Sequence, residues 1–295
     1  MSEPAATPTV WTIRALLTWT TEYLAKKGTP PATARLEAQL LLAHVLKCKK
    51  VDLLVRYDEE PKEEHRAEYK SLLKRRVEGW PVAYLIGSRE FYLLTFEVSP
   101  AVLVPRPETE TLVAEALRLL KPHANPMVLD LCTGSGCIAI SIAHQKKDAR
   151  LTATDISPDA LDLAKRNAER NDVSGRVHFQ QGDLFAALPS GSLFYAIVCN
   201  PPYVTPTELA GLAPDVRDHE PRLALDGGPD GLAFYRRIAS DVERFLMPGG
   251  FLLLEIGATQ EEAVRVLLSE QPSLEVGKTL KDASGLPRVV SAKKR

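Results

Sequence analysis

A short apolar strand that runs directly into a glycine-rich turn is the feature that most constrains the fold of this chain. The residues MVLDL at 127–131 predict a buried strand, and CTGSGCIA follows at 132–139. Within this turn, Gly134, Gly136 and Ala139 have the spacing G-x-G-x-x-A. The glycines permit a tight turn and the close approach of a ligand, and the free N–H groups at the start of a helix favour an anionic group. The pattern therefore predicts a strand, a ligand-binding loop and a helix in succession.

Further apolar strands follow, with amphipathic segments between them. They are expected at 150–155, 176–181, 194–199 and 251–256. Ser157 and Pro158 form an N-cap and first-turn pair that begins one of the intervening helices. Strands that alternate with helices in this way are typical of a parallel sheet with helices on both faces. We predict a Rossmann-like, doubly wound α/β domain over residues 107–295, in which the closing SAKKR is a solvated tail.

The first 85 residues carry apolar side chains at helical spacing rather than strand patterns. One stripe consists of Ile13, Leu16, Leu17 and Leu24, and a second of Leu36, Leu40, Ala43 and Leu46. Such stripes predict a small helical bundle over residues 1–85. A β-rich run follows, with apolar residues at Phe91, Leu93, Phe96 and Val98. We therefore expect a β-hairpin linker at 86–106 between the bundle and the α/β domain.

The charge balance and the cysteines exclude several classes of protein. Lys and Arg total 37 against 38 Asp and Glu, so the chain lacks the overall positive charge that binds duplex nucleic acid. The cysteines, Cys48, Cys132, Cys137 and Cys199, form no C-x-x-C pair, and no histidine stands at zinc-ligand spacing. We therefore expect neither a metal nor a disulfide. Because there is no basic leader and no stretch of about 18 apolar residues, we expect a cytoplasmic monomer that contacts no membrane.

Two acidic residues follow the next predicted strands. Asp155 ends the strand after the glycine loop, where a carboxylate can accept hydrogen bonds from both hydroxyls of a ribose. Asp183 comes just after the third strand and suits a hydrogen bond to an adenine amino group, although an ordinary turn residue explains it equally well. The loop and these acids predict a nucleoside cofactor, but they do not separate a dinucleotide from S-adenosylmethionine.

A proline-rich tetrapeptide, Asn200, Pro201, Pro202 and Tyr203, lies where the predicted strand at 194–199 ends. The proline pair removes two N–H donors and keeps two carbonyl acceptors, so the segment is rigid and rich in acceptors. The Asn200 oxygen and the Pro201 carbonyl can each accept one N–H of a planar NH2 group, and Tyr203 can pack on its plane. These bonds strengthen as the nitrogen becomes tetrahedral and positive during methylation. We predict an N-methyltransferase site for an amide or an exocyclic base amine, with a plain strand-ending turn as the alternative.

Beyond these motifs, several longer segments form a pattern of their own. They are residues 79–110, NPPYVT at 200–205, EPRLALDGGPDGLAFYRRI at 220–238, LLEIG at 253–257, and Asp282, Gly285 and Arg288. Together they resemble the HemK-type glutamine methyltransferases that modify peptide chain release factors. The resemblance covers nearly the whole chain, and the leading helical bundle is similar to the substrate-binding domain of that family.

The resemblance implies a class I methyltransferase that uses S-adenosylmethionine and releases S-adenosylhomocysteine. The implied acceptor is the side-chain amide nitrogen, N5, of the glutamine in the Gly-Gly-Gln motif of class 1 peptide chain release factors. The domain at 1–85 would bind the release factor, and the domain at 107–295 would carry out the transfer. No direct contact with nucleic acid is implied.

The site residues of the family carry over position by position. The cofactor would contact Cys132, Thr133, Gly134, Ser135, Gly136, Asp155, Asp183, Leu184 and Asn200. The glutamine would contact Asn200, Pro201, Pro202 and Tyr203, of which Asn200, Pro201 and Tyr203 are the catalytic candidates. Arg106 and Glu108 would line or brace the same mouth, unless they form an interdomain ion pair or cap a helix. Two positions depart from the family pattern, because Cys132 replaces a glycine and Leu184 replaces a residue that is often aromatic.

Other functions are compatible with some of these residues. A sister enzyme that methylates a ribosomal-protein glutamine shares NPPY, and so does a DNA or RNA adenine-N6 methyltransferase, which flips its base out of the stack. An adenine methyltransferase would need a basic region with aromatic residues to recognise the nucleic acid, whereas the predicted helical bundle of this chain carries both signs of charge. A nicotinamide-dependent dehydrogenase accounts for the glycine loop and Asp155 but not for NPPY. A binding module with the methyltransferase fold but no catalytic activity is a further alternative, although it would not need the glycine loop, Asp155 and NPPY together.

Overall fold

The computed structural model describes residues 9–295, so the first eight residues of the predicted bundle lie outside the described part. The chain divides into two compact units. The helical unit contains the residues up to Gly87 together with Pro214–His219, and the sheet unit contains Ser88–Ala213 and Glu220–Arg295. Each unit has a hydrophobic core of its own.

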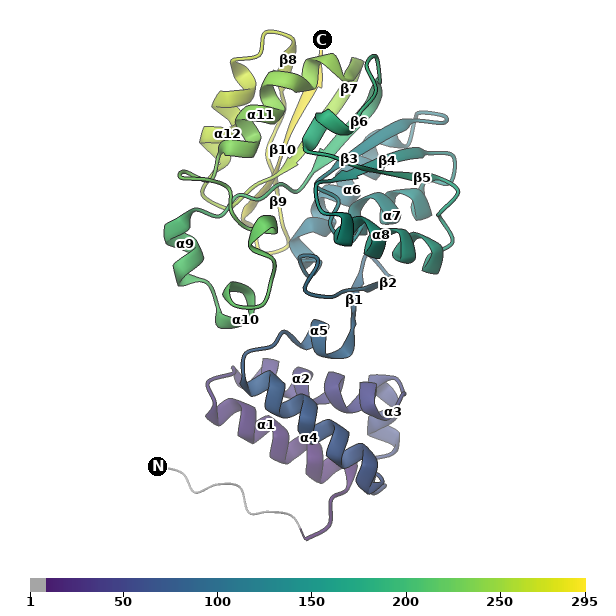
Figure 1. Cartoon of the computed structure of the whole chain (residues 1–295), viewed down its shortest axis with the longest axis vertical. Helices are drawn as coiled ribbons and strands as arrows, with labels where there is room; N and C mark the ends of the chain where they lie inside the picture. The colour runs from purple at the N-terminus through teal and green to yellow at the C-terminus, as the bar shows by residue number, and fades with distance from the viewer. Residues whose placement is uncertain (1–8) are drawn as a thin grey trace. The chain divides into compact units, whose positions relative to one another are not determined.

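Helices α1 to α5 form the body of the helical unit (Figure 1). They are α1 (Ile13–Lys26), α2 (Pro31–Val45), α3 (Lys50–Val55), α4 (Glu63–Val77) and α5 (Val82–Ile86). Thr12 begins α1, because its hydroxyl accepts a hydrogen bond from the Ala15 N–H at 3.2 Å. The predicted bundle is confirmed, and Leu41 and Leu53 lie in its core. Leu36 is 44% exposed, however, so the second predicted stripe was wrong at that position.

A segment from the second half of the sequence also packs within the helical unit. It contains α10 (Pro214–Arg217) and His219, whose ring centroid lies 4.5 Å from that of Trp80. Arg76 forms a bidentate pair with Glu37, with both hydrogen bonds at 2.9 Å, and also lies 3.8 Å from the Asp215 carboxylate. The predicted boundaries treat the bundle as one continuous stretch, because no local feature of residues 214–219 indicates this long-range contact.

The sheet unit begins with the expected antiparallel hairpin, formed by β1 (Ser88–Phe91) and β2 (Leu94–Glu97). The main sheet then has the strand order β5-β4-β3-β6-β7-β10-β8, and β9 pairs with β10. In chain order, the elements are η1 (Pro107–Thr109), α6 (Glu110–Leu120), β3 (Met127–Leu131), α7 (Cys137–Gln145), β4 (Arg150–Asp155), α8 (Pro158–Arg170), β5 (Val177–Gln181), η2 (Leu184–Ala187), β6 (Phe194–Cys199), α9 (Pro206–Gly211), η3 (Arg222–Ala224), α11 (Ala233–Asp241), η4 (Val242–Arg244), β7 (Leu246–Glu255), α12 (Glu261–Ser269), β8 (Leu274–Val276), β9 (Leu280–Lys281) and β10 (Pro287–Lys294).

The strands from β3 to β7 are parallel, and β3, β6 and β7 bury side chains on both of their faces. Val128 packs in one core with α6 and α7, and its neighbour Leu129 packs in the other with α11 and α12. Figure 1 shows these two pairs of helices on opposite faces of the sheet. Leu131 pairs with Thr154 of β4 and with Cys199 of β6, so three strands end at one edge of the sheet. The predicted α/β class is confirmed, and this edge is where a doubly wound sheet binds ligands.

The C-terminal end of the chain differs from the prediction. The expected solvated tail was wrong, because residues 291–294 belong to β10, which lies antiparallel between β7 and β8. Val290 and Ala292 are buried on one face of this strand, while the Lys294 ammonium donates hydrogen bonds to the carbonyls of Glu243 and Leu246 at 2.6 and 2.8 Å. The basic residues of SAKKR concealed the end of a strand whose buried residues, Val289, Val290 and Ala292, lie mostly before this segment.

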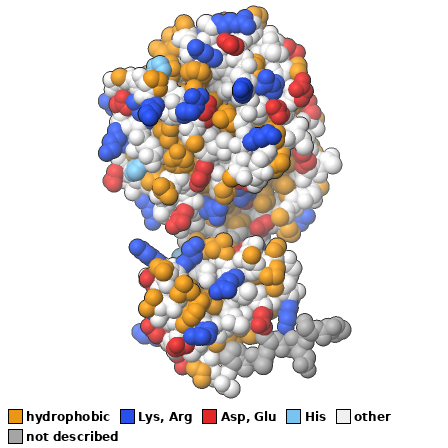
Figure 2. Space-filling view, turned by 180° about the vertical axis from the view of Figure 1, so that it is seen from behind, with side chains coloured by type: hydrophobic (Ala, Val, Ile, Leu, Met, Phe, Trp, Pro, Cys, Tyr) orange, Lys and Arg blue, Asp and Glu red, His pale blue; other side chains and the backbone are white. Residues whose placement is uncertain are grey.

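The surface of the described residues carries both signs of charge. On the face in Figure 2, Lys and Arg side chains of the sheet unit are interspersed with Asp and Glu side chains. Among the helices of residues 9–295, none is both long enough and apolar enough to cross a bilayer.

Candidate functional site

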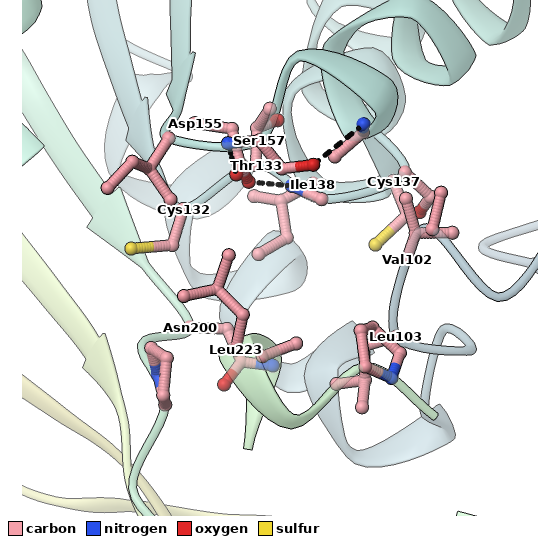
Figure 3. Close-up of a pocket in the computed structure, with 18 of the residues that line it drawn as sticks. Val102, Leu103, Cys132, Thr133, Cys137, Ile138, Asp155, Ser157, Asn200 and Leu223 are labelled. Carbon is pink, nitrogen blue, oxygen red and sulfur yellow. Dashed lines mark hydrogen bonds between the residues drawn. The ribbon is translucent and has the colours of Figure 1, made fainter. Parts of the chain in front are cut away.

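A cavity of about 390 Å³ lies in the sheet unit beyond the carboxyl ends of β3, β4 and β6. Figure 3 shows Asp155, Ser157 and Thr133 on one side of this cavity and Asn200 and Leu223 across from them. The predicted site residues that line it are Arg106, Cys132, Thr133, Gly134, Ser135, Asp155, Asp183, Leu184, Asn200 and Pro202. Gly136, Pro201, Tyr203 and Glu108 do not line it. Residues from all three predicted motifs therefore meet around one cavity.

The glycine loop needs its two glycines for different reasons. Gly134 has φ +55°, and a Cβ atom there would meet nothing within 4 Å, so its backbone is open to the cavity. Gly136 has φ +81°, and a Cβ atom there would lie 2.7 Å from Cδ1 of Ile140 and 3.2 Å from Cβ of Ala164. The first glycine thus leaves room for a ligand, and the second permits close packing between the loop, α7 and α8.

Cys132 begins the loop in a backbone conformation that glycine adopts more easily. Its φ of +56° lies in the left-handed region, which is uncommon for a residue with a Cβ atom. The loop is held there by hydrogen bonds from the Thr133 N–H to the Thr154 carbonyl at 3.0 Å and from the Gly136 N–H to the Thr133 carbonyl at 2.8 Å. The departure from glycine noted in the sequence therefore falls on a position where the backbone conformation favours glycine.

Asp155 connects the glycine loop to the end of β4. One carboxylate oxygen accepts the Gly134 N–H at 2.8 Å, and the other accepts the Ser157 N–H at 2.9 Å. Burial raises the pKa of this carboxyl group, and the backbone N–H groups counteract that effect. Because each oxygen accepts only one of these bonds, both keep a lone pair for a ligand hydroxyl.

Asp130 stabilises the same loop by accepting hydrogen bonds from Thr133 and Ala139. Its side chain is fully buried at the end of β3, where one oxygen accepts hydrogen bonds from the Thr133 hydroxyl at 2.6 Å and the Ala139 N–H at 3.2 Å. The other oxygen has no hydrogen-bond partner among the described residues. Burial raises the pKa of Asp130 to about 7, and the nearby charge of Asp155 acts in the same direction.

The far wall of the cavity combines an apolar residue with an ion pair. Leu184 is buried and has a left-handed backbone with φ +52°. Asp183 pairs with Arg237 of α11 at 2.8 Å, and both residues line the cavity. The Asp183 carboxylate therefore already has one cationic partner, and Arg237 is a further charged group beside the predicted adenine position.

The NPPY segment is held by residues far away in the sequence. A Cβ atom at Gly227 would lie 2.6 Å from Cα of Tyr203, and one at Gly231 would lie 2.5 Å from the Tyr203 carbonyl oxygen. The Gln260 side-chain amide donates to that carbonyl at 3.0 Å, and the Val204 N–H donates to the Leu225 carbonyl at 2.9 Å. The segment at 220–231 therefore packs directly on the backbone of the tetrapeptide.

Asn200 and Tyr203 lie differently with respect to the cavity. The Asn200 amide lines it and donates a hydrogen bond of 3.4 Å to the hydroxyl of Thr109, a residue that is 2% exposed. Tyr203 packs on the core beneath, where burial and Glu255 raise its pKa to about 12. Glu255, at the end of β7, is 1% exposed, and burial raises its pKa to about 7. The role of Tyr203 in packing on a planar acceptor group stays a prediction.

Arg106 braces the mouth of the cavity from within the sheet unit. Its guanidinium forms an ion pair with Glu220 at 2.6 Å, and Glu220, which is 6% exposed, also accepts the Val104 N–H at 3.1 Å. Both partners belong to the sheet unit, so the interdomain alternative does not describe this pair. Glu108 lies in η1, and one of its oxygens is buried without a hydrogen-bond partner among the described residues.

Comparison with known proteins identifies matches in both units. The family model of the PrmC N-terminal domain matches residues 15–87, and that of the methyltransferase small domain matches residues 110–213. The release factor glutamine methyltransferase of Rhodopirellula baltica is 41% identical over 290 residues, which cover 97% of each chain. The relative of the same name from Geobacter sulfurreducens is 43% identical over 286 residues, which cover 97% of this chain and 98% of the relative. This chain belongs to the release factor glutamine methyltransferase family.

A solved structure agrees with this assignment at the level of the fold. A methyltransferase from Pyrococcus furiosus, 19% identical, matches 76% of this chain and 98% of its own with a TM-score of 0.50. The family resemblance expected from the longer sequence segments is confirmed, and so is the expectation that the chain is a methyltransferase.

Some residues around the site that were not predicted had a signal in the sequence, and others had none. Asp130 and Glu255 had a usable signal, because each is an acid at the end of an otherwise apolar strand and charged residues are rarely buried without a partner. Thr109 and Arg237 had none, since their contacts with Asn200 and Asp183 join segments far apart in the chain. Such pairs depend on the tertiary fold alone.

Proposed function

We propose that this protein transfers a methyl group from S-adenosylmethionine to the side-chain amide nitrogen of the glutamine in the Gly-Gly-Gln motif of class 1 release factors. The observation that carries the proposal is the Asn200 amide, which lines the same cavity as the glycine loop and Asp155. The substrate is supported by the relatives named release factor glutamine methyltransferase, which match nearly the full length of the chain.

Several features of the cavity support S-adenosylmethionine as the cofactor. The open backbone at Gly134 can accept the amino-acid part of the cofactor, and the free lone pairs of Asp155 can accept the ribose hydroxyls. Leu184 offers an apolar surface to the adenine, and Asp183 can accept a hydrogen bond from its amino group. When bound, the cofactor would supply an electrophilic methyl group on a positively charged sulfur.

The NPPY segment orients the acceptor nitrogen. A glutamine amide is a poor nucleophile because its lone pair is delocalised into the carbonyl group. The Asn200 oxygen, at the cavity, accepts one of its N–H groups, and the carbonyl of Pro201, a residue that does not line the cavity, is the proposed acceptor of the other, so that the face of the amide is presented to the methyl donor. As the nitrogen becomes positive, both hydrogen bonds strengthen, and the transition state is stabilised more than the ground state. The proton becomes acidic after transfer, so no strong base is needed before attack.

We also propose separate roles for the parts of the chain. The helical domain at 1–85 docks the body of the release factor, the segment at 86–106 is a linker, and the domain at 107–295 carries out the transfer. The match of residues 15–87 to the PrmC N-terminal domain supports a separate domain at this end of the chain. We expect kcat/KM to be at least tenfold higher with an intact release factor than with a short Gly-Gly-Gln peptide. Equal values for the two substrates would contradict the docking role.

The direct test follows labelled methyl from S-adenosylmethionine into purified acceptors. A class 1 release factor is compared with its Gly-Gly-Gln variant in which glutamine is replaced by alanine, and ribosomal protein and adenine-containing DNA are assayed in parallel. We expect label on the native release factor alone. Label on ribosomal protein would favour the sister enzyme, and label on DNA would favour the adenine-N6 alternative.

A further inference from the structure

Asn167, in α8, joins two segments of the sheet unit that are far apart in the chain. Its side chain is fully buried. The amide nitrogen donates to the carbonyl of Ser135 in the glycine loop and to the carbonyl of Glu97 at the end of β2, both at 3.0 Å. The amide oxygen accepts the Glu97 N–H at 2.7 Å. One side chain therefore connects the glycine loop to the hairpin formed by β1 and β2.

The three partners allow the Asn167 amide only one orientation. Two of the groups that face it are carbonyl oxygens, which only accept hydrogen bonds, and the third is an N–H group, which only donates. If the amide rotated by half a turn, its oxygen would face both carbonyls and its NH2 group would face the N–H group. All three bonds would then be lost among buried atoms, at a large cost in free energy.

The two segments that Asn167 connects lead to different walls of the cavity. Ser135 lines the cavity from the glycine loop. Glu97 does not line it, but the chain continues from Glu97 into a segment that does, which includes Val102 and Leu103. Figure 3 shows Val102 and Leu103 across the cavity from Cys132, which begins the glycine loop. The hydrogen bonds of Asn167 thus join one wall to the start of the segment that forms the other.

We propose that Asn167 is a positioning residue for S-adenosylmethionine, because it holds the glycine loop against the hairpin that carries the opposite wall. Its bond to Ser135 turns that carbonyl toward α8, so that a partial negative charge does not face the carboxylate of the cofactor. Its two bonds to Glu97 fix the distance between the walls. The proposal rests on the proposed use of the cavity by the cofactor and adds the residue that holds its loop.

The same face of α8 carries a natural control for this role. Ala164, one turn before Asn167, packs so closely on Gly136 that a Cβ atom there would lie 3.2 Å away. Asn171, one turn after Asn167, donates to the Thr95 carbonyl of the same hairpin at 3.2 Å and to the Asn167 carbonyl at 2.9 Å. Among the described residues, Asn171 has no hydrogen bond to the glycine loop. It therefore holds the hairpin without holding the loop.

The binding test compares Asn167→Asp with Asn171→Asp, which is the same chemical change at the two positions. The new carboxylate at 167 can still accept the Glu97 N–H, but it has no hydrogen for the carbonyls of Glu97 and Ser135. We expect the Kd of S-adenosylmethionine to rise roughly tenfold in Asn167→Asp, the effect of one lost hydrogen bond in the loop. At saturating cofactor, kcat should equal that of the wild type, because Asn200 is not touched.

The control separates positioning of the loop from general loss of stability. Asn171→Asp should bind S-adenosylmethionine as the wild type does, and thermal melts should show that both variants are folded. A Kd for Asn167→Asp within about threefold of the wild type would overturn the proposal. So would an equal loss of affinity in Asn171→Asp, because weakened packing of the hairpin would then explain both variants.

Hydrogen–deuterium exchange in the full-length protein tests the connection itself. No residue of the hairpin at 88–97 lines the cavity, so protection of its amides by the cofactor must be transmitted through the protein. S-adenosylmethionine should slow exchange in both the loop at 132–136 and the hairpin in the wild type and in Asn171→Asp, but only in the loop in Asn167→Asp. An unprotected hairpin in the wild type would overturn the proposal even if Asn167→Asp failed to fold. Protection that persists in Asn167→Asp would also overturn it.

Both measurements use the cofactor alone, so they do not depend on the identity of the acceptor. If the wild type methylates no release factor but Asn167→Asp loses cofactor affinity and hairpin protection as expected, the choice of substrate fails and the positioning role stands. If the release factor is methylated but Asn167→Asp binds the cofactor as the wild type does, the positioning role fails and the proposed function stands.

Discussion

Replacing Asp155 by asparagine tests the cofactor site with the smallest possible change in shape. Each carboxylate oxygen accepts one backbone N–H, from Gly134 at 2.8 Å and from Ser157 at 2.9 Å. An asparagine has only one oxygen, so its NH2 group must face one of these N–H donors in either orientation. The substitution therefore loses a charged acceptor for the ribose and also places two donors opposite each other.

The size of the effect follows from these contacts. A hydrogen bond to a charged group contributes about 1.5–3 kcal/mol, and a buried donor left without an acceptor costs about 1–3 kcal/mol. Because the residue is partly open to the cavity, we take a value near the lower end of the combined range, about 3 kcal/mol. This corresponds to a Kd for S-adenosylmethionine that is roughly 100-fold higher than in the wild type.

Isothermal titration calorimetry with S-adenosylmethionine and S-adenosylhomocysteine measures this loss directly. Asp162→Asn is the matched control. Asp162 lies in α8, the helix that follows Asp155, but its side chain is 65% exposed and pairs with Lys165 at the surface. The control should bind both ligands as the wild type does, and thermal melts should show that both variants are folded. A Kd for Asp155→Asn within about threefold of the wild type would refute the ribose role, since that is under half of even one weak charged bond.

Three further substitutions test other parts of the structure. Asn200→Ala should lower kcat by roughly 100-fold, about 2.7 kcal/mol, with unchanged cofactor affinity, and a single-turnover rate equal to the wild type would exclude Asn200 from the transition state. Gly136→Ala places a Cβ atom 2.7 Å from Ile140 at φ +81°, so urea unfolding should show a loss of about 1–3 kcal/mol. Glu37→Gln breaks the bidentate pair with Arg76, in which the Arg76 side chain is 14% exposed and the Glu37 side chain 11%. The free energy of unfolding should fall by about 2 kcal/mol, whereas a melting temperature equal to the wild type would show that the pair contributes nothing.

The parallel strands could be predicted from the sequence because each is a short apolar run between turn signals. The predicted ranges 127–131, 150–155 and 194–199 coincide with β3, β4 and β6. The same reasoning failed at β10, where the consecutive lysines Lys293 and Lys294 follow the buried Ala292, and at Leu36, where a residue on the helical stripe is exposed. Local sequence pattern thus identifies a strand of mainly apolar residues better than a strand that contains several charged residues.

The candidate site could be predicted only where its residues lie at the ends of strands. The glycine loop and Asn200 each follow a predicted strand, Asp155 ends one, and parallel strands bring their carboxyl ends to one edge. Thr109 and Glu220 reach the site from segments that have no strand of their own beside it. Their positions depend on how η1 and the segment at 220–231 pack on the sheet, and no local pattern encodes that packing.

The scaffold around the tetrapeptide therefore matters as much as the tetrapeptide itself. Two prolines cannot anchor their own backbone, because they have no N–H to donate, so the position of their acceptors must be set by neighbours. Here the Tyr203 carbonyl is held by Gln260, and the Tyr203 backbone contacts Gly227 and Gly231 so closely that neither position has space for a side chain. It follows that an NPPY sequence without these partners predicts a turn, whereas NPPY with two such glycines and an amide donor predicts a rigid acceptor site.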